Sequence, residues 1–238
     1  MYHITLLLMF LFVFLPITLC YASVLKAPNT PVATHKQLSV CGTHLCNHEN
    51  KPIQLVGMST HGLQWYGWGK CLTAKSLDVL AEDWEVDIVR LSLYVQEGGY
   101  ESDPEGFTQQ VQWLINAVSQ RGLYVLIDWH QLTPGDPNFN LSLAKRFFKD
   151  IVQANAHRNN LLYDIANEPN GVTWQAIYRY ANEMIPWIRQ YDKKAPILVG
   201  THGWSTFGLS DGQSLQDILS LPIPYDNIMY IFIKPKIS

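Results

Sequence analysis

The sequence has no block of lysine or arginine anywhere in its 238 residues, and its formal net charge at pH 7 is only −3. Nucleic acids and anionic lipids bind to clustered positive charge, so the composition argues against both kinds of partner. The hydrophobic fraction of 47% and the charged fraction of 16% are those of an ordinary globular protein. The length fits one large α/β domain or two small ones.

Charge is missing altogether from the first 25 residues, since Lys26 is the first charged side chain. The apolar run there ends in small residues, and Cys20-Tyr21-Ala22 fits a signal-peptide cleavage site. We predict a cleaved signal peptide at residues 1–22, in preference to an uncleaved anchor, for which the run is also long enough. A polar leader then covers residues 23–37. The mature protein is expected to be secreted, extracellular and not bound to a membrane, with Asn140-Leu141-Ser142 as its one usable glycosylation sequon.

Cysteine is scarce, with four residues in the chain, one of which lies in the predicted signal peptide. The other three, Cys41, Cys46 and Cys71, are an odd number for an oxidising compartment. Cys41 and Cys46 bracket a predicted hairpin and can bridge across it, and Cys71 can pair with either. A zinc site is the alternative because His44 and His48 interleave with two of the cysteines. Their spacing fits no standard zinc motif, so we expect no metal.

Beyond the leader, apolar runs alternate with helical patterns. After a hairpin at about 38–54, strands are expected at 53–59, 87–94, 123–130, 161–168, 196–202 and 227–233, and helices at 73–85, 107–120, 141–157, 174–190 and 214–220. Strands and helices that alternate at this spacing predict βαβ units and a parallel sheet. The nearly continuous apolar strands indicate a sheet that is covered on both faces.

Both an open doubly wound sheet and a (β/α)8 TIM barrel satisfy this pattern. A Gly-rich phosphate-binding loop is missing after the first strand, whereas polar residues gather at several strand ends. The C-terminal ends of barrel strands are where active sites are built. We therefore predict an α/β fold of the (β/α)8 barrel type, preceded by a β-hairpin, over residues 38–238.

Five successive strand ends carry polar or aromatic side chains. These rim candidates are His61, Tyr94, His130, Asn167 with Glu168, and His202 with Trp204. Any one of them alone is explained as an ordinary polar residue, but a barrel would bring all five ends around one mouth. Glu168 suits a general acid because a partly buried carboxyl has a raised pKa. The alternative is a glutamate favoured by the dipole of a helix that begins after Pro169.

A cation in the middle of a strand, Arg90, needs a partner inside the barrel. Asp128, Glu168 or both are the expected partners, and a purely structural ion pair is the alternative. Asp128 shares its side of the strand with His130, so we expect Asp128 to support the site rather than to act as a catalyst.

The loop after the first strand is aromatic, with Trp65, Tyr66 and Trp68, and Trp204 follows the fifth strand. A sugar ring can lie flat against such rings. The alternative, that these side chains fold onto the barrel, is stronger for Trp68 than for Trp65.

Four stretches together, "GMSTHGLQWYG", "VRLSLYVQEGGY", "VLIDWH" and "YDIANEPNG", resemble glycoside hydrolase family 5, the cellulase family A. The resemblance runs from about Leu38 to Tyr230 and points to secreted endo-β-1,4-glucanases of bacterial and plant-parasitic nematode type. It implies retaining hydrolysis of a cellulose-like β-1,4-glucan without a cofactor. The roles that it implies are acid/base for Glu168, a hydrogen bond to the sugar 2-hydroxyl for Asn167, support beneath the site for Arg90, a site histidine at His130, and substrate contact for His61, Trp65, Tyr66, Tyr94 and Trp204.

The same resemblance implies a second carboxylate, the nucleophile, at the end of a seventh strand. Only six of eight strands are counted here, and Ile233 and Pro235 stand where similar enzymes have a His-x-Tyr pair. We therefore expect a truncated barrel with no nucleophile, no turnover, and apolar edges at its first and last strands. A secreted, non-catalytic glucan-binding protein that uses Trp65, Tyr66 and Trp204 is the alternative.

Overall fold

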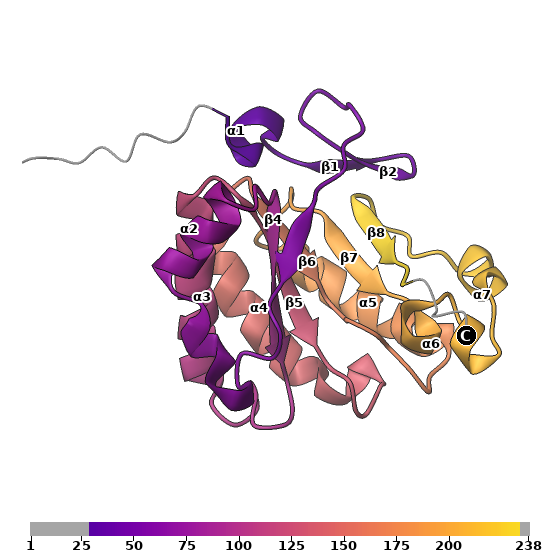
Figure 1. Cartoon of the computed structure of the whole chain (residues 1–238). Coiled ribbons are helices and arrows are strands. Elements are labelled where there is room, and N and C mark those ends of the chain that lie inside the picture. Colours follow the sequence, from indigo (N-terminus) through magenta and orange to yellow (C-terminus); the bar gives the residue numbers. More distant parts are fainter. Residues whose placement is uncertain (1–28, 234–238) are drawn as a thin grey trace, which may run out of the picture.

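The structure is a computed structural model that describes residues 29–233. Its main sheet has six parallel strands in the order β3-β4-β5-β6-β7-β8 (Figure 1). The strands are β3 (Gly57–Ser59), β4 (Ile88–Tyr94), β5 (Tyr124–His130), β6 (Leu161–Asp164), β7 (Ile197–Gly200) and β8 (Ile228–Ile231). Sequential parallel order is the arrangement of a (β/α)8 barrel wall, so the predicted α/β class and six strands are confirmed. The predicted signal peptide lies outside the described residues.

The helices alternate with these strands as predicted. They are α2 (Ala74–Glu82), α3 (Pro104–Gln120), α4 (Leu141–Asn155), α5 (Trp174–Arg189) and α7 (Leu215–Ser220), with a short α6 (His202–Ser205) and the 3-10 turns η1 (Trp65–Cys71), η2 (Pro137–Asn140) and η3 (Leu209–Asp211). Helix α3 begins three residues before the predicted start because Asp103 caps it, accepting a hydrogen bond from Gly106 N, and Pro104 occupies the first helical position. No helix within residues 29–233 combines the length and apolar character needed to cross a bilayer.

Alternate residues of each strand face opposite sides of the sheet. In β5, Val125, Ile127 and Trp129 are buried in the large cluster that includes residues of α3 to α5, whereas Tyr124 belongs to a smaller cluster on the other side. The smaller cluster contains Val32, Leu38 and Leu162 in addition to Tyr124, with Leu126 and Leu198 packed against it. The inner side of the sheet is therefore apolar near the strand N-termini.

The N-terminal part of the described chain covers that apolar end. Strands β1 (Ser39–Cys41) and β2 (His44–Cys46) form the predicted hairpin, and a disulfide joins Cys41 to Cys46, which was one of the expected pairings. Cys71 is exposed and not disulfide-bonded. The Tyr124 hydroxyl donates to Lys36 O at 2.6 Å. The hairpin lies across the N-terminal end of the barrel strands (Figure 1).

Helix α1 (Pro31–His35) lies where we expected only a polar leader. Thr30 caps it, the side chain of Val32 is buried, and Val32 N donates to Gly122 O at 3.0 Å. A helix of five residues is too short to form on its own, so contacts with the barrel stabilise it.

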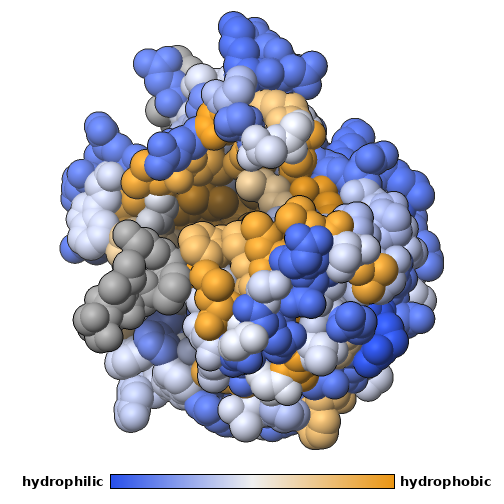
Figure 2. Space-filling model, turned by 90° about the vertical axis from the view of Figure 1, so that its right-hand side faces the viewer, coloured by the Kyte–Doolittle hydropathy of each residue, from blue (hydrophilic) through white to orange (hydrophobic). Residues whose placement is uncertain are grey.

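Strands β3 and β8 each pair on one side only within residues 29–233. All three residues of β3 are exposed, and Phe232 and Ile233 are exposed just after β8. Figure 2, which views the β8 side of the molecule, shows apolar side chains around a hollow on this face. Within residues 29–233, β3 and β8 are thus the unpaired edges of the sheet, with Met58, Phe232 and Ile233 as exposed apolar side chains on or next to them.

The predicted glycosylation sequon is not accessible. Asn140 is only 6% exposed, and its Nδ2 donates to Gln131 Oε1 at 3.2 Å. An oligosaccharide on this nitrogen would replace that hydrogen bond and would need space that the fold fills. The prediction of a usable sequon is therefore wrong for the folded protein.

Candidate active site

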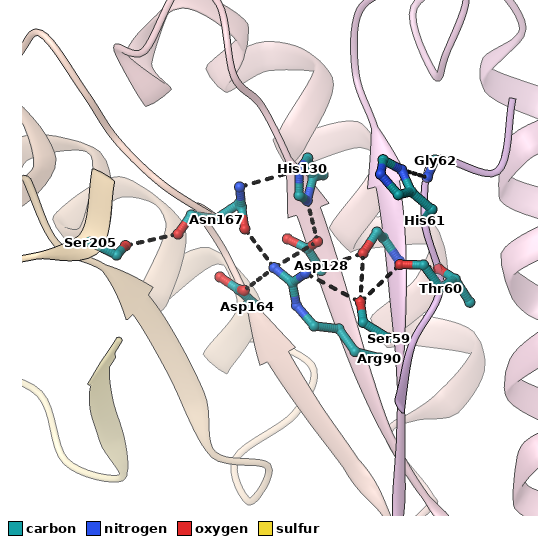
Figure 3. A network of polar contacts seen from close by, with 11 residues as sticks. Ser59, Thr60, His61, Gly62, Arg90, Asp128, His130, Asp164, Asn167 and Ser205 are labelled. Carbon is teal, nitrogen blue, oxygen red and sulfur yellow. Dashed lines mark hydrogen bonds and ion pairs between the residues drawn. The ribbon is translucent and has the colours of Figure 1, made fainter. Parts of the chain in front are cut away.

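Three strands bring charged side chains together on the inner side of the sheet. Strand register pairs Ser92 of β4 with Asp128 of β5, and Asp128 with Asp164 of β6. Arg90, two residues before Ser92, is therefore on the same side and reaches both carboxylates. Its Nη2 lies 2.9 Å from Asp128 Oδ2 and 3.1 Å from Asp164 Oδ2 (Figure 3). Toward the C-terminal ends of the strands, beyond the apolar cluster around Tyr124, the barrel interior thus becomes charged.

The partners of Arg90 differ in part from the prediction. Asp128 is a partner, as expected, and Asp164 is a second one that sequence reasoning missed. Within the described chain Glu168 forms no ion pair with Arg90. Pairing of β6 ends at Asp164, so the alternation of sides that places Asp164 inward no longer applies four residues later. The sequence did contain a signal for Asp164. Asp164 lies two residues after the inward-facing Leu162 in β6, so both face the same side of the sheet.

Two buried carboxylates share the guanidinium of Arg90, which is itself 24% exposed. Asp128 and Asp164 are 0% and 1% exposed, and their Oδ1 atoms have no hydrogen-bond partner among residues 29–233. Burial, with the negative charge of Asp128 as a second cause, raises the pKa of Asp164 to about 8, despite the opposing effect of Arg90. The cluster therefore favours a proton on Asp164 in neutral solution.

Asn167 connects this cluster to His130. Its Oδ1 accepts a hydrogen bond from Arg90 Nη2 at 2.6 Å, which leaves Nδ2 to face His130 Nε2 at 3.3 Å. Because Nδ2 can only donate, Nε2 accepts and His130 Nδ1 carries the proton that is donated to Asp128 Oδ2 at 2.7 Å. The amide of Asn167 and the ring of His130 are thereby fixed in orientation (Figure 3).

Glu168 follows Asn167 and is half-buried. It lines a small pocket together with Trp129, Gln131, Gly135, Pro137, Ala166, Asn167 and Pro169. Burial raises the pKa of Glu168, and the electrostatic effects of His130 and Arg90 only partly oppose this rise. Helix α5 begins at Trp174, so Glu168 does not belong to its first turn and the helix-dipole explanation fails.

Aromatic rings form a continuous wall beside the polar cluster. The ring of Tyr94 stacks on His130 with centroids 4.0 Å apart, and Trp65 lies 4.5 Å from Tyr94. His61 completes the wall, 4.7 Å from Trp65. Trp68 contacts His61 edge-on at 5.2 Å and is 45% exposed, so it does not fold fully onto the barrel.

Two predicted substrate contacts lie apart from this wall. Tyr66 is 87% exposed, and the one aromatic ring near it within residues 29–233 is Trp68. The side chain of Trp204 is 41% exposed, and its backbone N–H donates to Pro169 O at 3.0 Å, next to Glu168. The loops after β3 and β7 thus both present a tryptophan to solvent.

His202 does not face the rim, contrary to the expectation for the five strand ends. Its side chain is fully buried, with its ring centroid 6.0 Å from that of Trp174 of α5. Its Nε2 lies 3.5 Å from Asp217 Oδ2 of α7. His202 lies two residues beyond Gly200, the last paired residue of β7, where the alternation of strand sides no longer applies. For residues 29–233 no cluster of three His, Cys, Asp or Glu side chains is arranged to hold a metal ion.

Comparisons with known proteins agree with this arrangement. The family model described as cellulase (glycosyl hydrolase family 5) matches residues 46–232. The chain belongs to glycosyl hydrolase family 5. It is 62% identical over 204 residues to endoglucanase MaCel5A of Microbulbifer sp. (strain ALW1), covering 86% of this chain and 40% of that protein. With endoglucanase E-5 of Thermobifida fusca it shares 54% identity over 203 residues, covering 85% of this chain and 43% of that protein.

The fold matches a solved catalytic domain over most of the chain. The crystal structure of the catalytic domain of Thermobifida fusca endoglucanase Cel5A (E5) superimposes with a TM-score of 0.83 at 53% identity, covering 86% of this chain and 66% of that one. A variant of that domain in complex with cellotetraose gives the same values. The chain thus spans about two fifths of the two curated relatives.

Proposed function

We propose that residues 29–233 form the glucan-binding and proton-donating part of a retaining endo-β-1,4-glucanase, with Glu168 as the general acid and base. The observation that carries this proposal is the half-buried Glu168, whose pKa is raised and whose carboxyl has no hydrogen-bond partner among the described residues. Such a carboxyl can hold a proton near neutral pH and deliver it to a leaving oxygen. The endoglucanase names of the relatives support the same activity.

The neighbouring side chains have roles that follow from their contacts. The remaining N–H of the Asn167 amide is available to a sugar hydroxyl, because the other hydrogen bonds of this side chain fix its orientation. Arg90 and Asp128 hold Asn167 and His130 in place from below. The wall of Tyr94, Trp65 and its neighbours provides flat rings for a β-1,4-glucan chain, consistent with the cellotetraose complex of the Thermobifida fusca domain.

Double displacement also needs a nucleophile about 5–5.5 Å from the acid. In residues 29–233 the two other carboxylates of this cluster, Asp128 and Asp164, are both bound to Arg90, so we assign neither as nucleophile. We therefore propose that residues 23–238 bind glucan without hydrolysing it. On this view a non-catalytic glucan-binding protein is the second candidate, supported by an aromatic wall that does not depend on a nucleophile.

Binding and hydrolysis are tested separately. Cellotetraose affinity is measured by calorimetry for the wild type, Trp65→Ala and the matched control Trp113→Ala, an exposed tryptophan of α3. We expect Trp65→Ala to weaken binding at least about fivefold, equivalent to about 1 kcal/mol, and the control to leave it unchanged. Equal affinities for all three would contradict the proposed binding surface.

Hydrolysis of soluble β-1,4-glucan is compared between the wild type and Glu168→Gln. We expect no turnover above this control. Turnover that Glu168→Gln abolishes would establish the acid/base and refute the proposed inactivity, whereas turnover that Glu168→Gln leaves intact would refute the role of Glu168.

We propose further that the protein is secreted. The Cys41–Cys46 disulfide supports an oxidising compartment. N-terminal sequencing of protein from the culture medium should begin at Ser23, and a protein retained with residues 1–22 intact would contradict this.

A further inference from the structure

The loop after β7 contains an unusual backbone segment. Gly203, Trp204 and Ser205 have φ values of +65°, +59° and +56°, and Phe207 has +57°. Left-handed backbone is unfavourable for residues with a side chain, and consecutive left-handed residues are rare. Such a conformation persists only where surrounding contacts determine it, and it is common at functional sites.

This left-handed turn, residues 203–205, forms hydrogen bonds with the residues on both sides of Glu168. The buried Ser205 hydroxyl donates to Asn167 O at 2.9 Å, and the backbone N–H of Trp204 donates to Pro169 O at 3.0 Å. These two carbonyls belong to the residues directly before and after Glu168. The turn therefore holds the backbone of the acid at two points.

The direction of the Ser205 hydroxyl is fixed as well. A carbonyl oxygen only accepts, so the hydroxyl proton must point to Asn167 O. Its lone pair then accepts from Thr201 N at 3.2 Å. Figure 3 shows Ser205 reaching Asn167 from the side of the site opposite His130.

Strand β7 is also in direct contact with this backbone. A Cβ at Gly200 would collide with the carbonyl oxygens of Ala166 and Asn167, so only glycine allows the close approach. On the opposite side, Asn167 N donates to Trp129 O of β5 at 3.4 Å. Asn167 is thus held between β5 and the loop after β7.

We propose that Ser205 is a positioning residue that fixes the direction of the Glu168 and Asn167 side chains through its hydrogen bond to Asn167 O. This inference rests on the proposed role of Glu168. Without the hydroxyl, the Asn167 carbonyl and the Thr201 N–H both lose a buried partner, and the segment 167–169 can move away from β7. The Glu168 carboxyl then gains water, although no atom that contacts substrate has been removed.

The test measures the pKa of the Glu168 carboxyl by 13C NMR titration in the full chain. Two variants remove the hydroxyl: Ser205→Ala, which keeps the backbone strain, and Ser205→Gly, which relieves it. Two controls match these changes elsewhere: Ser102→Ala, whose hydroxyl likewise donates to a backbone carbonyl (Gly99 O, 2.7 Å), and Glu85→Gly, at an exposed position with φ of +50°.

We expect both Ser205 variants to lower the pKa of Glu168 by at least about 0.5 unit, because added hydration favours the charged carboxylate. The controls should leave it within about 0.2 unit, since their sites do not touch residues 167–169. An unchanged pKa in folded Ser205 variants, or an equal change in the controls, would overturn the proposal. Failure of both Ser205 variants to fold would also overturn it, because the hydroxyl would then serve the fold as a whole.

The same titration separates this inference from the proposed function. The wild-type pKa of Glu168 tests the proposed function, because an ordinary value near 4.3 would argue against a general acid. The difference in the pKa of Glu168 between the Ser205 variants and the wild type tests the positioning role, whatever the wild-type value is.

Discussion

The two faces of strand β5 carry different kinds of side chain. Outward, Val125, Ile127 and Trp129 are all apolar and pack against helices. Inward, the sequence changes along the strand from the apolar Leu126 to the charged Asp128 and then to His130. The outer face is apolar throughout because helices cover its whole length. The inner face runs from the N-terminal end, which the hairpin covers, to the C-terminal rim, which is open. Stability is thus concentrated outside the sheet and chemistry inside it, on adjacent residues.

The largest expected effect is on the outer face. Trp129 is fully buried, with ring centroids 5.2 Å from Tyr100 and 5.5 Å from Phe147. Trp129→Ala should reduce the free energy of unfolding by about 3–5 kcal/mol because it leaves a large cavity. Urea denaturation measures this loss. The exposed Trp113 is the control, and a loss as large for Trp113→Ala would contradict the comparison.

The next effect concerns the inner face. Arg90→Met leaves the buried Asp128 carboxylate and the buried Asp164 carboxyl without their cation, which should cost about 3 kcal/mol at pH 7. In the variant Asp164 loses the cation that lowers its pKa, so its folded-state pKa rises further. Stability lost at pH 8 should therefore be partly regained at pH 5, unlike the loss in Trp129→Ala. A loss independent of pH would show that the guanidinium contributes by packing alone.

A smaller effect separates the two carboxylates. A raised pKa of Asp164 in the folded state means that its contribution to stability is complete below the unfolded value near 3.9 and is lost as pH rises toward 8. Asp164→Asn should remove this dependence. Between pH 4 and 8 the free energy of unfolding of the wild type should fall more steeply, by up to about 1.4 kcal/mol per pH unit, than that of the variant. Parallel curves would mean that Asp164 stays ionised.

The smallest effect is expected where neither face is covered. Met58 of the edge strand β3 is 41% exposed. Met58→Thr should change the free energy of unfolding by less than about 0.5 kcal/mol, because little burial is lost. Chemical denaturation gives this value, and a loss above about 1 kcal/mol would show that β3 is covered in solution, for example by a second molecule.

Alternation of apolar runs and helical patterns predicted the strand order and the inward position of Asp128. The same reasoning failed where the backbone leaves regular structure. It offered Glu168 beside Asp128 as a partner of Arg90 and missed Asp164, and it placed His202 on the rim. Both errors concern side chains beyond the last paired residue of a strand, where side-chain direction depends on turns that have no simple sequence period.

Helix α1 and the left-handed turn were missed for a related reason. Both are held by contacts with residues far away in the sequence: Gly122 for Val32, and Asn167 for Ser205. Local propensity describes neither, since one is a five-residue helix and the other a conformation that side chains disfavour.

The hairpin and the acid lie at opposite ends of the barrel, and this has a practical consequence. Thr43 is exposed at the hairpin turn, beyond the N-terminal ends of the strands, whereas Glu168 follows the C-terminal end of β6. A dye, a bead or a sensor surface coupled through a residue introduced at position 43 would hold the molecule by its closed end. Immobilised in this way, the protein would present its rim to a passing polysaccharide.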